Sequence, residues 1–181
     1  MFRCAIGPES ELRLLEERHA EEVFALVDGD RAYLRAWLPW VDRSTEVEVT
    51  RSFIRHALEQ FARNEILVAG VWHQDRFAGC VGTVPINWAD LSVEIGYWLG
   101  KSFQGQGLVT NGVKSLVRHA FTEWRLNRVV IRCATANIRS QGVPKRLGFT
   151  LEGTLRQAHH VNGEFQDLHV YSQLSREWTG F

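Results

Sequence analysis

One feature constrains the fold of this chain most: a strand-like run leads through a glycine-rich turn into a strongly amphipathic helix. The run covers residues 94–99 and the turn covers residues 104–107. The apolar positions of the helix recur from Val109 to Trp124 with the helical period of roughly 3.6 residues. At such a junction the first backbone N–H groups of the helix lack intrahelical partners and point outward. Together with the helix dipole, they predict a binding site for a phosphate or pyrophosphate group.

Two glycines shape this turn. Gly105 and Gly107 have no Cβ and therefore allow the backbone to approach an anion closely. The turn lacks the Lys-Ser/Thr end of a P-loop, and Thr110 stands where a dinucleotide-binding fold has its third glycine. From the local pattern alone, a phosphate site and a merely tight connection are equally good interpretations.

The order of the predicted elements indicates an α+β fold with three layers. Helical patterns dominate the first part, and hairpin-connected strands with two further helices follow. Thr45 and Glu48 have capping-box spacing, and a period of four from Val49 to Phe61 predicts the buried face of the helix that they open. The expected strands are residues 11–16, 66–72, 77–86, 92–99, 128–134, 151–156 and 166–174, and the expected helices are residues 19–27, 30–40, 45–61, 109–124 and 140–147.

Length and composition restrict the function classes. The 181 residues fit one domain, residues 1–181, and Lys plus Arg equals Asp plus Glu at 21 each, which disfavours direct nucleic-acid binding. Three Cys without short spacing predict neither a disulfide framework nor a metal site, and Cys80 and Cys133 are expected to be buried reduced thiols. We expect no secretory signal and no membrane span, and therefore a cytoplasmic protein.

Five motifs, taken together, resemble one enzyme superfamily. Gln104-x-x-Gly107-x-Val109 resembles the Q/R-x-x-G-x-G/A signature of GNAT acetyltransferases, with Val109 where the signature prefers Gly or Ala. The wider segment is similar to the RimL/RimJ branch, the ribosomal-protein N-terminal acetyltransferases. The matching motifs are the EIGYWL strand at 94–99, the QGQG turn at 104–107, Leu126-Asn127-Arg128, Asn137 with Ser140, and Gly148-Phe149. Looser similarity covers nearly the whole chain.

The resemblance implies a fold and a cofactor site. The fold is the GNAT-type three-layer arrangement, in which helices flank a mostly antiparallel mixed sheet with splayed central strands. The cofactor is acetyl-coenzyme A (acetyl-CoA), whose pyrophosphate would meet the turn and whose pantetheine arm would pair with a strand edge like an added strand. The implied cofactor-binding residues are Tyr97, Trp98, Leu99, Gln104, Gly105, Gln106, Gly107, Leu108, Val109, Thr110, Asn137 and Ser140.

Acetyl transfer to an amine requires a base for the amine, a stabilised thioester oxygen and a proton for the leaving thiolate. Glu94 is the first candidate for the base, through a water, although a solvated strand carboxylate is an equally good interpretation. Ser140 is the candidate thiol-side donor by its match to RimL-like enzymes, or else a helix-entry hydroxyl. Pro144 stands where many GNAT enzymes have a tyrosine acid, which favours Ser140 or Tyr171.

The acceptor side is less defined. RimL-like enzymes carry a glutamate after the G-F pair, and at the matching place this chain has His159, followed by His160. A histidine can act as a base near neutral pH, but an adjacent pair is more often polar surface. Trp37, Trp40 and Trp88 are the expected substrate-binding residues, with core packing as the alternative.

These observations predict an N-acetyltransferase that moves the acetyl group directly to an amine. The favoured acceptor is the N-terminal α-amine of a ribosomal protein, as the RimL/RimJ resemblance implies. The alternatives are a small-molecule amine such as a polyamine, an antibiotic or peptide toxin, and an acyl-CoA-binding sensor without turnover. An exposed strand edge and the last hairpin are compatible with a homodimer.

Overall fold

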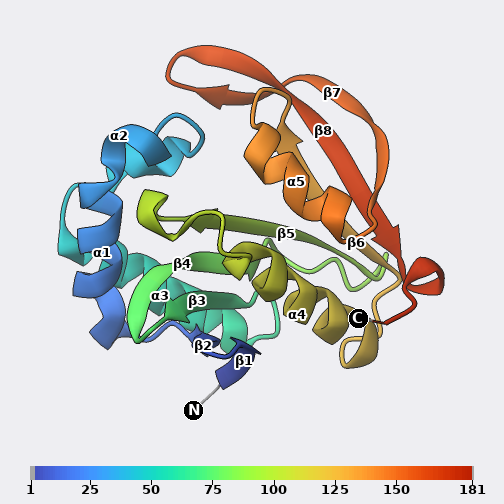
Figure 1. The fold of residues 1–181 in the computed structure, drawn as a ribbon, viewed down its shortest axis with the longest axis horizontal. Coiled ribbons are helices and arrows are strands. Elements are labelled where there is room, and N and C mark those ends of the chain that lie inside the picture. The colour runs from blue at the N-terminus through green and yellow to red at the C-terminus, as the bar shows by residue number, and fades with distance from the viewer. Residues whose placement is uncertain (1–2, 181) are drawn as a thin grey trace.

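The computed structural model describes residues 3–180, which form an eight-stranded sheet with helices on both faces (Figure 1). The strand order is β1-β2-β3-β4-β5-β6-β8-β7, and every neighbouring pair is antiparallel except β5 and β6. The strands are β1 (Arg3–Gly7), β2 (Ser10–Leu14), β3 (Val68–His73), β4 (Arg76–Thr83), β5 (Ser92–Leu99), β6 (Arg128–Ala134), β7 (Thr150–Val161) and β8 (Glu164–Leu174). The α-helices are α1 (Ala20–Gly29), α2 (Arg31–Leu34), α3 (Val47–Ala62), α4 (Leu108–Thr122) and α5 (Ile138–Arg146). This confirms the expected α+β fold with three layers.

Side-chain alternation along the strands divides the core between the two faces of the sheet. One face packs on α4, whose buried stripe runs through Val113, Leu116 and Val117. The other face packs on α1 and α3, where Trp72 and Phe77 of neighbouring strands meet Ile54. The helices therefore hold the sheet from both sides, and the sheet centre between them is buried.

The two parallel strands, β5 and β6, separate soon after they begin. Their ladder joins Ser92–Glu94 to 128–130 and stops there. Beyond that point β5 stays paired with β4 as far as Leu99, and β6 stays paired with β8 as far as Ala134. Residues 95–99 of β5 therefore present a backbone edge with no ladder partner on the β6 side among the described strands. This is the splay that the resemblance implies.

The glycine-rich turn has the backbone that its sequence predicts. Gly107 is the N-cap of α4 with a φ of 75°, and Gly105 has a φ of 77°. Residues other than glycine adopt this left-handed backbone conformation only with strain. The turn therefore presents the N-terminus of a 15-residue helix at the mouth of the splay.

Three elements in the first part of the chain differ from the prediction. The helix α3 has no side-chain cap, and its buried residues are Thr50, Ile54 and Ala57, while Val49 and Phe53 are 38% and 51% exposed. The helix expected over residues 30–40 ends at Leu34, turns follow at residues 35–37, and a short 3-10 helix (Pro39–Arg43) comes next. The strand β1 was not predicted.

The C-terminal hairpin of β7 and β8 reaches beyond the rest of the sheet. Its turn residues Asn162 and Gly163 have φ values of 51° and 79°, which confirms the predicted hairpin turn. The register of β7 shifts between Leu155 and His159, around Gln157 with its φ of 51°. The hairpin tip thereby bends towards α2, as Figure 1 shows.

Among the described residues, no helix has the length and apolar character that crossing a membrane would need.

Candidate active site

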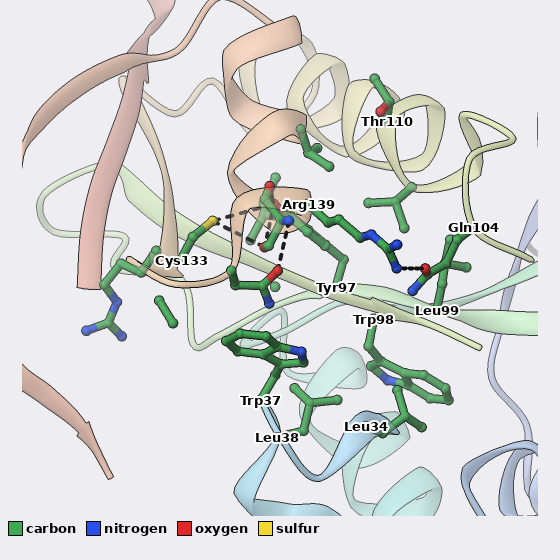
Figure 2. Close-up of a pocket in the computed structure, with 18 of the residues that line it drawn as sticks. Leu34, Trp37, Leu38, Tyr97, Trp98, Leu99, Gln104, Thr110, Cys133 and Arg139 are labelled. Atoms are coloured by element: carbon green, nitrogen blue, oxygen red, sulfur yellow. Dashed lines mark hydrogen bonds between the residues drawn. The ribbon is translucent and has the colours of Figure 1, made fainter. Parts of the chain in front are cut away.

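A cavity of about 1060 Å³ occupies the splay between β5 and β6. It runs from the glycine-rich turn, past α5, to α2 and the segment after it (Figure 2). The described residues that line it include eleven of the twelve predicted cofactor residues, together with Gly96, Cys133, Arg139 and Arg146. The exception is Gln106, which is exposed and whose side chain donates to the Ser102 carbonyl at 3.4 Å.

One end of the cavity is suited to a polyanion. A Cβ built on Gly105 would meet nothing within 4 Å, so the space in front of the turn is open. Arg139 Nη1 donates to Gln104 Oε1 at 2.5 Å, and Arg146 Nη2 donates to Thr110 Oγ1 at 2.9 Å. Two guanidinium groups and a helix N-terminus therefore converge on one opening.

Sequence reasoning missed Arg139 and Arg146. The available signal was their spacing of seven residues on the short helix that Asn137 opens, which places them on one face. Asn137 Oδ1 caps that helix by accepting from the Ser140 N–H at 3.1 Å. The predicted N-x-x-S helix entry is thus confirmed as a capping arrangement.

Three polar side chains meet on the α5 side of the splay. The Tyr97 hydroxyl donates to the Ser140 carbonyl at 2.8 Å, and Ser140 Oγ lies 3.3 Å from the Tyr97 hydroxyl and 3.2 Å from Cys133 Sγ. Burial raises the pKa of Tyr97 well above its ordinary value, and burial also raises the pKa of the Cys133 thiol. Both groups therefore keep their protons at neutral pH. Cys80 and Cys133 are buried and not joined in a disulfide, as predicted.

Glu94 lies on the opposite face of the splay. Along β5, Val93 and Ile95 belong to the core beside α4, and Tyr97 packs against the same core, while Trp98 packs with the residues of α1 and α2. Because successive strand side chains alternate, Glu94 faces the α1–α2 side. Its Oε2 lies 2.8 Å from Arg132 Nη2 of β6, and the two side chains are 22% and 40% exposed. Both line the cavity.

The three predicted substrate tryptophans separate in space. Trp37 lines the cavity, beside Leu38 (Figure 2). Trp40 packs instead on Trp98, with ring centroids 5.7 Å apart. Trp88 lies away from the cavity lining, where it packs on Trp124 at 6.3 Å and donates Nε1–H to the Asn64 carbonyl at 2.9 Å. The structure therefore brings one of the three, Trp37, to the cavity.

The two histidines and Tyr171 have different surroundings. His159 lines the cavity, and its Nε2 lies 3.2 Å from the Trp37 carbonyl, so that nitrogen carries the hydrogen of this contact. His160 packs on the ring of Phe165 at 4.8 Å. Tyr171 is fully buried, and its hydroxyl donates to Gln141 Oε1 at 3.3 Å, so it is not placed at the cavity.

A second contact ties the hairpin to the α2 region. Asn162 Nδ2 donates to the Arg35 carbonyl at 3.0 Å, next to the contact of His159 with the Trp37 carbonyl. These residues are more than a hundred positions apart in the chain, at separations of 127 and 122. The hairpin and the segment after α2 thus close the cavity on the side away from the glycine-rich turn.

The fold and the cleft through the splayed sheet are those of an acetyltransferase. The chain belongs to the acetyltransferase (GNAT) domain family, whose model matches residues 10–150. The Bacillus subtilis (strain 168) protein YdaF, named as a ribosomal N-acetyltransferase, is 34% identical over 181 residues, which cover 99% of each chain.

Two solved structures share the fold closely. One is RimL, the ribosomal L7/L12 alpha-N-protein acetyltransferase, in complex with coenzyme A bound through a disulfide to one of its cysteines. It has a TM-score of 0.92 at 30% identity, over 96% of this chain and 98% of that chain. The other is the microcin C7 self-immunity acetyltransferase MccE with acetyl-CoA and AMP. It has a TM-score of 0.89 at 29% identity, over 93% and 94% of the two chains.

Proposed function

We propose that this protein is an acetyl-CoA-dependent N-acetyltransferase whose acceptor is the N-terminal α-amine of a ribosomal protein. The observation that carries the proposal is the cleft through the splayed sheet, which has Glu94 on one face and Ser140 with Tyr97 on the other. A transferase needs this separation, because the amine must lose a proton on one side of the acetyl group while the sulfur gains one on the other. The similarity to RimL and YdaF supports the ribosomal acceptor.

The residues present fit the cofactor. The open space before Gly105 and Gly107 suits a pyrophosphate, and Arg139 with Arg146 supply positive charge beside it. The unpaired edge of β5 at 95–99 suits the amide groups of a pantetheine arm. In this proposal the predicted cofactor residues hold their role, apart from Gln106, whose side chain points to Ser102.

Two protons then move, and residues of this chain accept one of them and donate the other. The bound cofactor supplies the acetyl group as a thioester, and transfer forms one carbon–nitrogen bond and breaks one carbon–sulfur bond. Glu94 takes the amine proton through a water, on the α1–α2 side. Ser140 Oγ lies 3.3 Å from the Tyr97 hydroxyl and holds a proton on the other side, where the sulfur leaves. The raised pKa of Tyr97 keeps that pair protonated.

His159 and Trp37 shape the acceptor end. The Nε2–H of His159 is committed to the Trp37 carbonyl, so in this proposal His159 holds the cleft wall in place and leaves the base role to Glu94. The Trp37 ring forms part of that wall, and Trp40 packs on Trp98, which also lines the cavity. Trp88 has no acceptor role in this arrangement, because it packs on Trp124.

Three broader properties complete the proposal. One sheet spanning β1 to β8 supports a single domain over residues 1–181. The exposed outer strand β7 supports a homodimer in which two such edges meet, and light scattering of the purified protein tests it. A ribosomal acceptor supports a cytoplasmic location, and no direct nucleic-acid contact is part of the proposed reaction.

The first test is release of the CoA thiol from acetyl-CoA. The purified protein is incubated with peptide N-termini, ribosomal proteins and small amines, and free thiol is followed with a chromogenic disulfide. We expect release with a peptide or a ribosomal protein. Release with small amines or a peptide toxin alone would replace the proposed acceptor, and CoA binding without any release would favour the sensor.

A further inference from the structure

The acceptor end of the cavity carries an ion pair between Glu94 and Arg132. The proposed chemistry gives a role to Glu94 but none to Arg132. Glu94 is the one carboxylate among the described residues that line the cavity, and Arg132 Nη2 lies 2.8 Å from its Oε2. The other two lining arginines, Arg139 and Arg146, lie beside the glycine-rich turn, where they contact Gln104 and Thr110. Arg132 therefore stands alone as a cation at the acceptor end.

The position of Arg132 follows from the splay. Glu94 pairs with Val130 in the last register position of the β5–β6 ladder, so Arg132 is the second residue past the separation point. Side chains two apart on a strand share a face. Arg132 thus projects towards the same side as Glu94, and its side chain lines the cavity and is 40% exposed. A guanidinium has five N–H donors, and an ion pair with one carboxylate oxygen leaves most of them available.

We propose that Arg132 is a specificity-determining residue that binds the carbonyl oxygen next to the acceptor amine. This rests on the proposed function and names the chemical class of acceptor: an amine on a carbon that also bears a carbonyl group. In an aminoacyl group the nitrogen and the carbonyl oxygen are roughly 3 Å apart, as backbone bond lengths require. Glu94 Oε2 and Arg132 Nη2 lie 2.8 Å apart with opposite charges, so the pair can serve both atoms, the amine through the water on Glu94 and the carbonyl oxygen through Arg132 directly.

The same pair disfavours polyamines. A polyamine carries several positive charges and has no carbonyl oxygen, so it gains from clusters of carboxylates. At this acceptor end it meets one carboxylate that is already balanced by a guanidinium. Replacement of Arg132 by a neutral residue frees Glu94 and removes the repulsion. The pair therefore selects α-amines of peptides over the isolated amines of polycations.

The test compares serinamide with ethanolamine, which is the same amine without the carbonyl group, and adds spermidine. Wild type, Arg132→Gln and Arg132→Lys are assayed for kcat/KM with each amine. Arg63→Gln is the matched control, because it breaks an exposed Arg63–Glu65 pair away from the cavity lining. Acetyl-CoA affinity and melting temperature are measured for every variant.

We expect Arg132→Gln to lower kcat/KM for serinamide by about tenfold or more, as loss of a charged hydrogen bond does. Ethanolamine should change less than about twofold and spermidine should improve, while Arg132→Lys should keep part of the serinamide activity. An equal loss with serinamide and ethanolamine would show that Arg132 acts only through Glu94 and would overturn the inference. Unchanged rates with all three amines would overturn it as well.

A binding measurement separates this inference from the proposed function. Calorimetry of serinamide and ethanolamine on the CoA-saturated protein needs no turnover. If wild type transfers acetyl to no peptide, the proposed acceptor fails, yet selective loss of serinamide binding in Arg132→Gln would still support the carbonyl contact. Equal binding of both amines by wild type would contradict it.

Discussion

The Tyr97 hydroxyl donates a 2.8 Å hydrogen bond to the Ser140 carbonyl, and the Ser140 hydroxyl lies 3.3 Å from the same Tyr97 oxygen. This double contact joins β5 to the first turn of α5 across the gap that β6 leaves. It fixes the Ser140 side chain on the α5 side of the cleft, 3.2 Å from Cys133 Sγ. The hydroxyl that we propose as the proton donor is thereby held at a position set by β5 and α5.

Removal of either partner should slow the chemical step more than cofactor binding. We expect Ser140→Ala and Tyr97→Phe each to lower kcat by about tenfold or more, because a hydrogen bond to a developing thiolate is lost. The double variant should lose little more than the worse single variant, since the two groups act as a unit. Fully additive losses would show that the two hydroxyls work independently.

The raised pKa of Tyr97 has a consequence for the pH profile. Its folded-state pKa lies well above the ordinary value of 10.0, mainly because the phenol is buried. The hydroxyl therefore stays protonated through the alkaline range in which the acceptor α-amine deprotonates. We expect a rate that rises with pH and reaches a plateau, and Tyr97→Phe should leave the shape of this curve unchanged.

Glu94→Gln tests the base. The substitution keeps the size of the side chain but removes its ability to take a proton, and we expect kcat to fall by about a hundredfold, a typical contribution of a general base. The alkaline rise in rate should flatten, while acetyl-CoA affinity should stay near wild type. Glu164→Gln, on the exposed hairpin, is the control. If Glu94→Gln kept the wild-type pH–rate curve, water rather than Glu94 would be the acceptor of the amine proton.

Gly107→Trp tests the phosphate turn. A side chain at this position projects into open space before the turn, with Asn111 Nδ2 at 4.0 Å as its nearest neighbour, and would fill the site that we propose for the pyrophosphate. We expect CoA affinity to fall by at least a hundredfold, about 2.8 kcal/mol. The protein should remain folded, because the left-handed backbone costs a side chain only about 1 kcal/mol.

Gly163→Trp is the matched control for that experiment. Gly163 has a similar φ of 79°, and a Cβ there meets nothing within 4 Å, but it lies in the hairpin turn. It should show the same small loss of stability with wild-type CoA affinity. Equal CoA affinity in the two tryptophan variants would move the pyrophosphate away from the turn.

The ion pair between Arg128 and Glu152, outside the cleft, predicts that the stability of the fold decreases in acid. Arg128 and the Ser172 hydroxyl both donate to the Glu152 carboxylate, and the Arg128 hydrogen bond is the main cause that lowers its pKa to about 2. A depressed carboxylate pKa stabilises the fold above the unfolded value, 4.5, and this stability is lost as the pH falls towards 2. Since Glu152 is 39% exposed, solvent screening limits the effect to about 1 kcal/mol.

Urea unfolding of wild type and Glu152→Gln measures this effect. The stability difference should be present at neutral pH and should shrink steadily as the pH drops through the window from 4.5 to 2. A difference that does not depend on pH would attribute the change to packing rather than to the ion pair.

Elements with a strong local pattern could be predicted from the sequence. The bounds of β5 and β6 agree with the prediction at both ends, and α4 agrees to within two residues, because their apolar runs are long and end at turns. The predicted face of α3 was wrong in its first half for a geometric reason. A period of four exceeds one helical turn, so the line through Val49, Phe53, Ala57 and Phe61 drifts around the helix. Val49 and Phe53 are exposed, whereas Ala57 is buried and Phe61 packs against the core.

The parts of the site in which segments far apart in the sequence meet could not be predicted. Arg132 gains its position from the point where two strands separate, and no local pattern shows that point. The contact of His159 with the Trp37 carbonyl joins residues 122 positions apart. By contrast, Glu94 and Ser140 were named as candidates because they lie within motifs whose order resembles a known branch.

The proposed acceptor is tested most directly by mass spectrometry of a ribosomal-protein peptide that carries both an N-terminal α-amine and an internal lysine, after incubation with acetyl-CoA. We expect the acetyl group on the α-amine, formed about a hundredfold more slowly when Glu94→Gln replaces wild type. An acetyl group on the lysine, or an unmodified peptide beside an acetylated small amine, would contradict the proposed function.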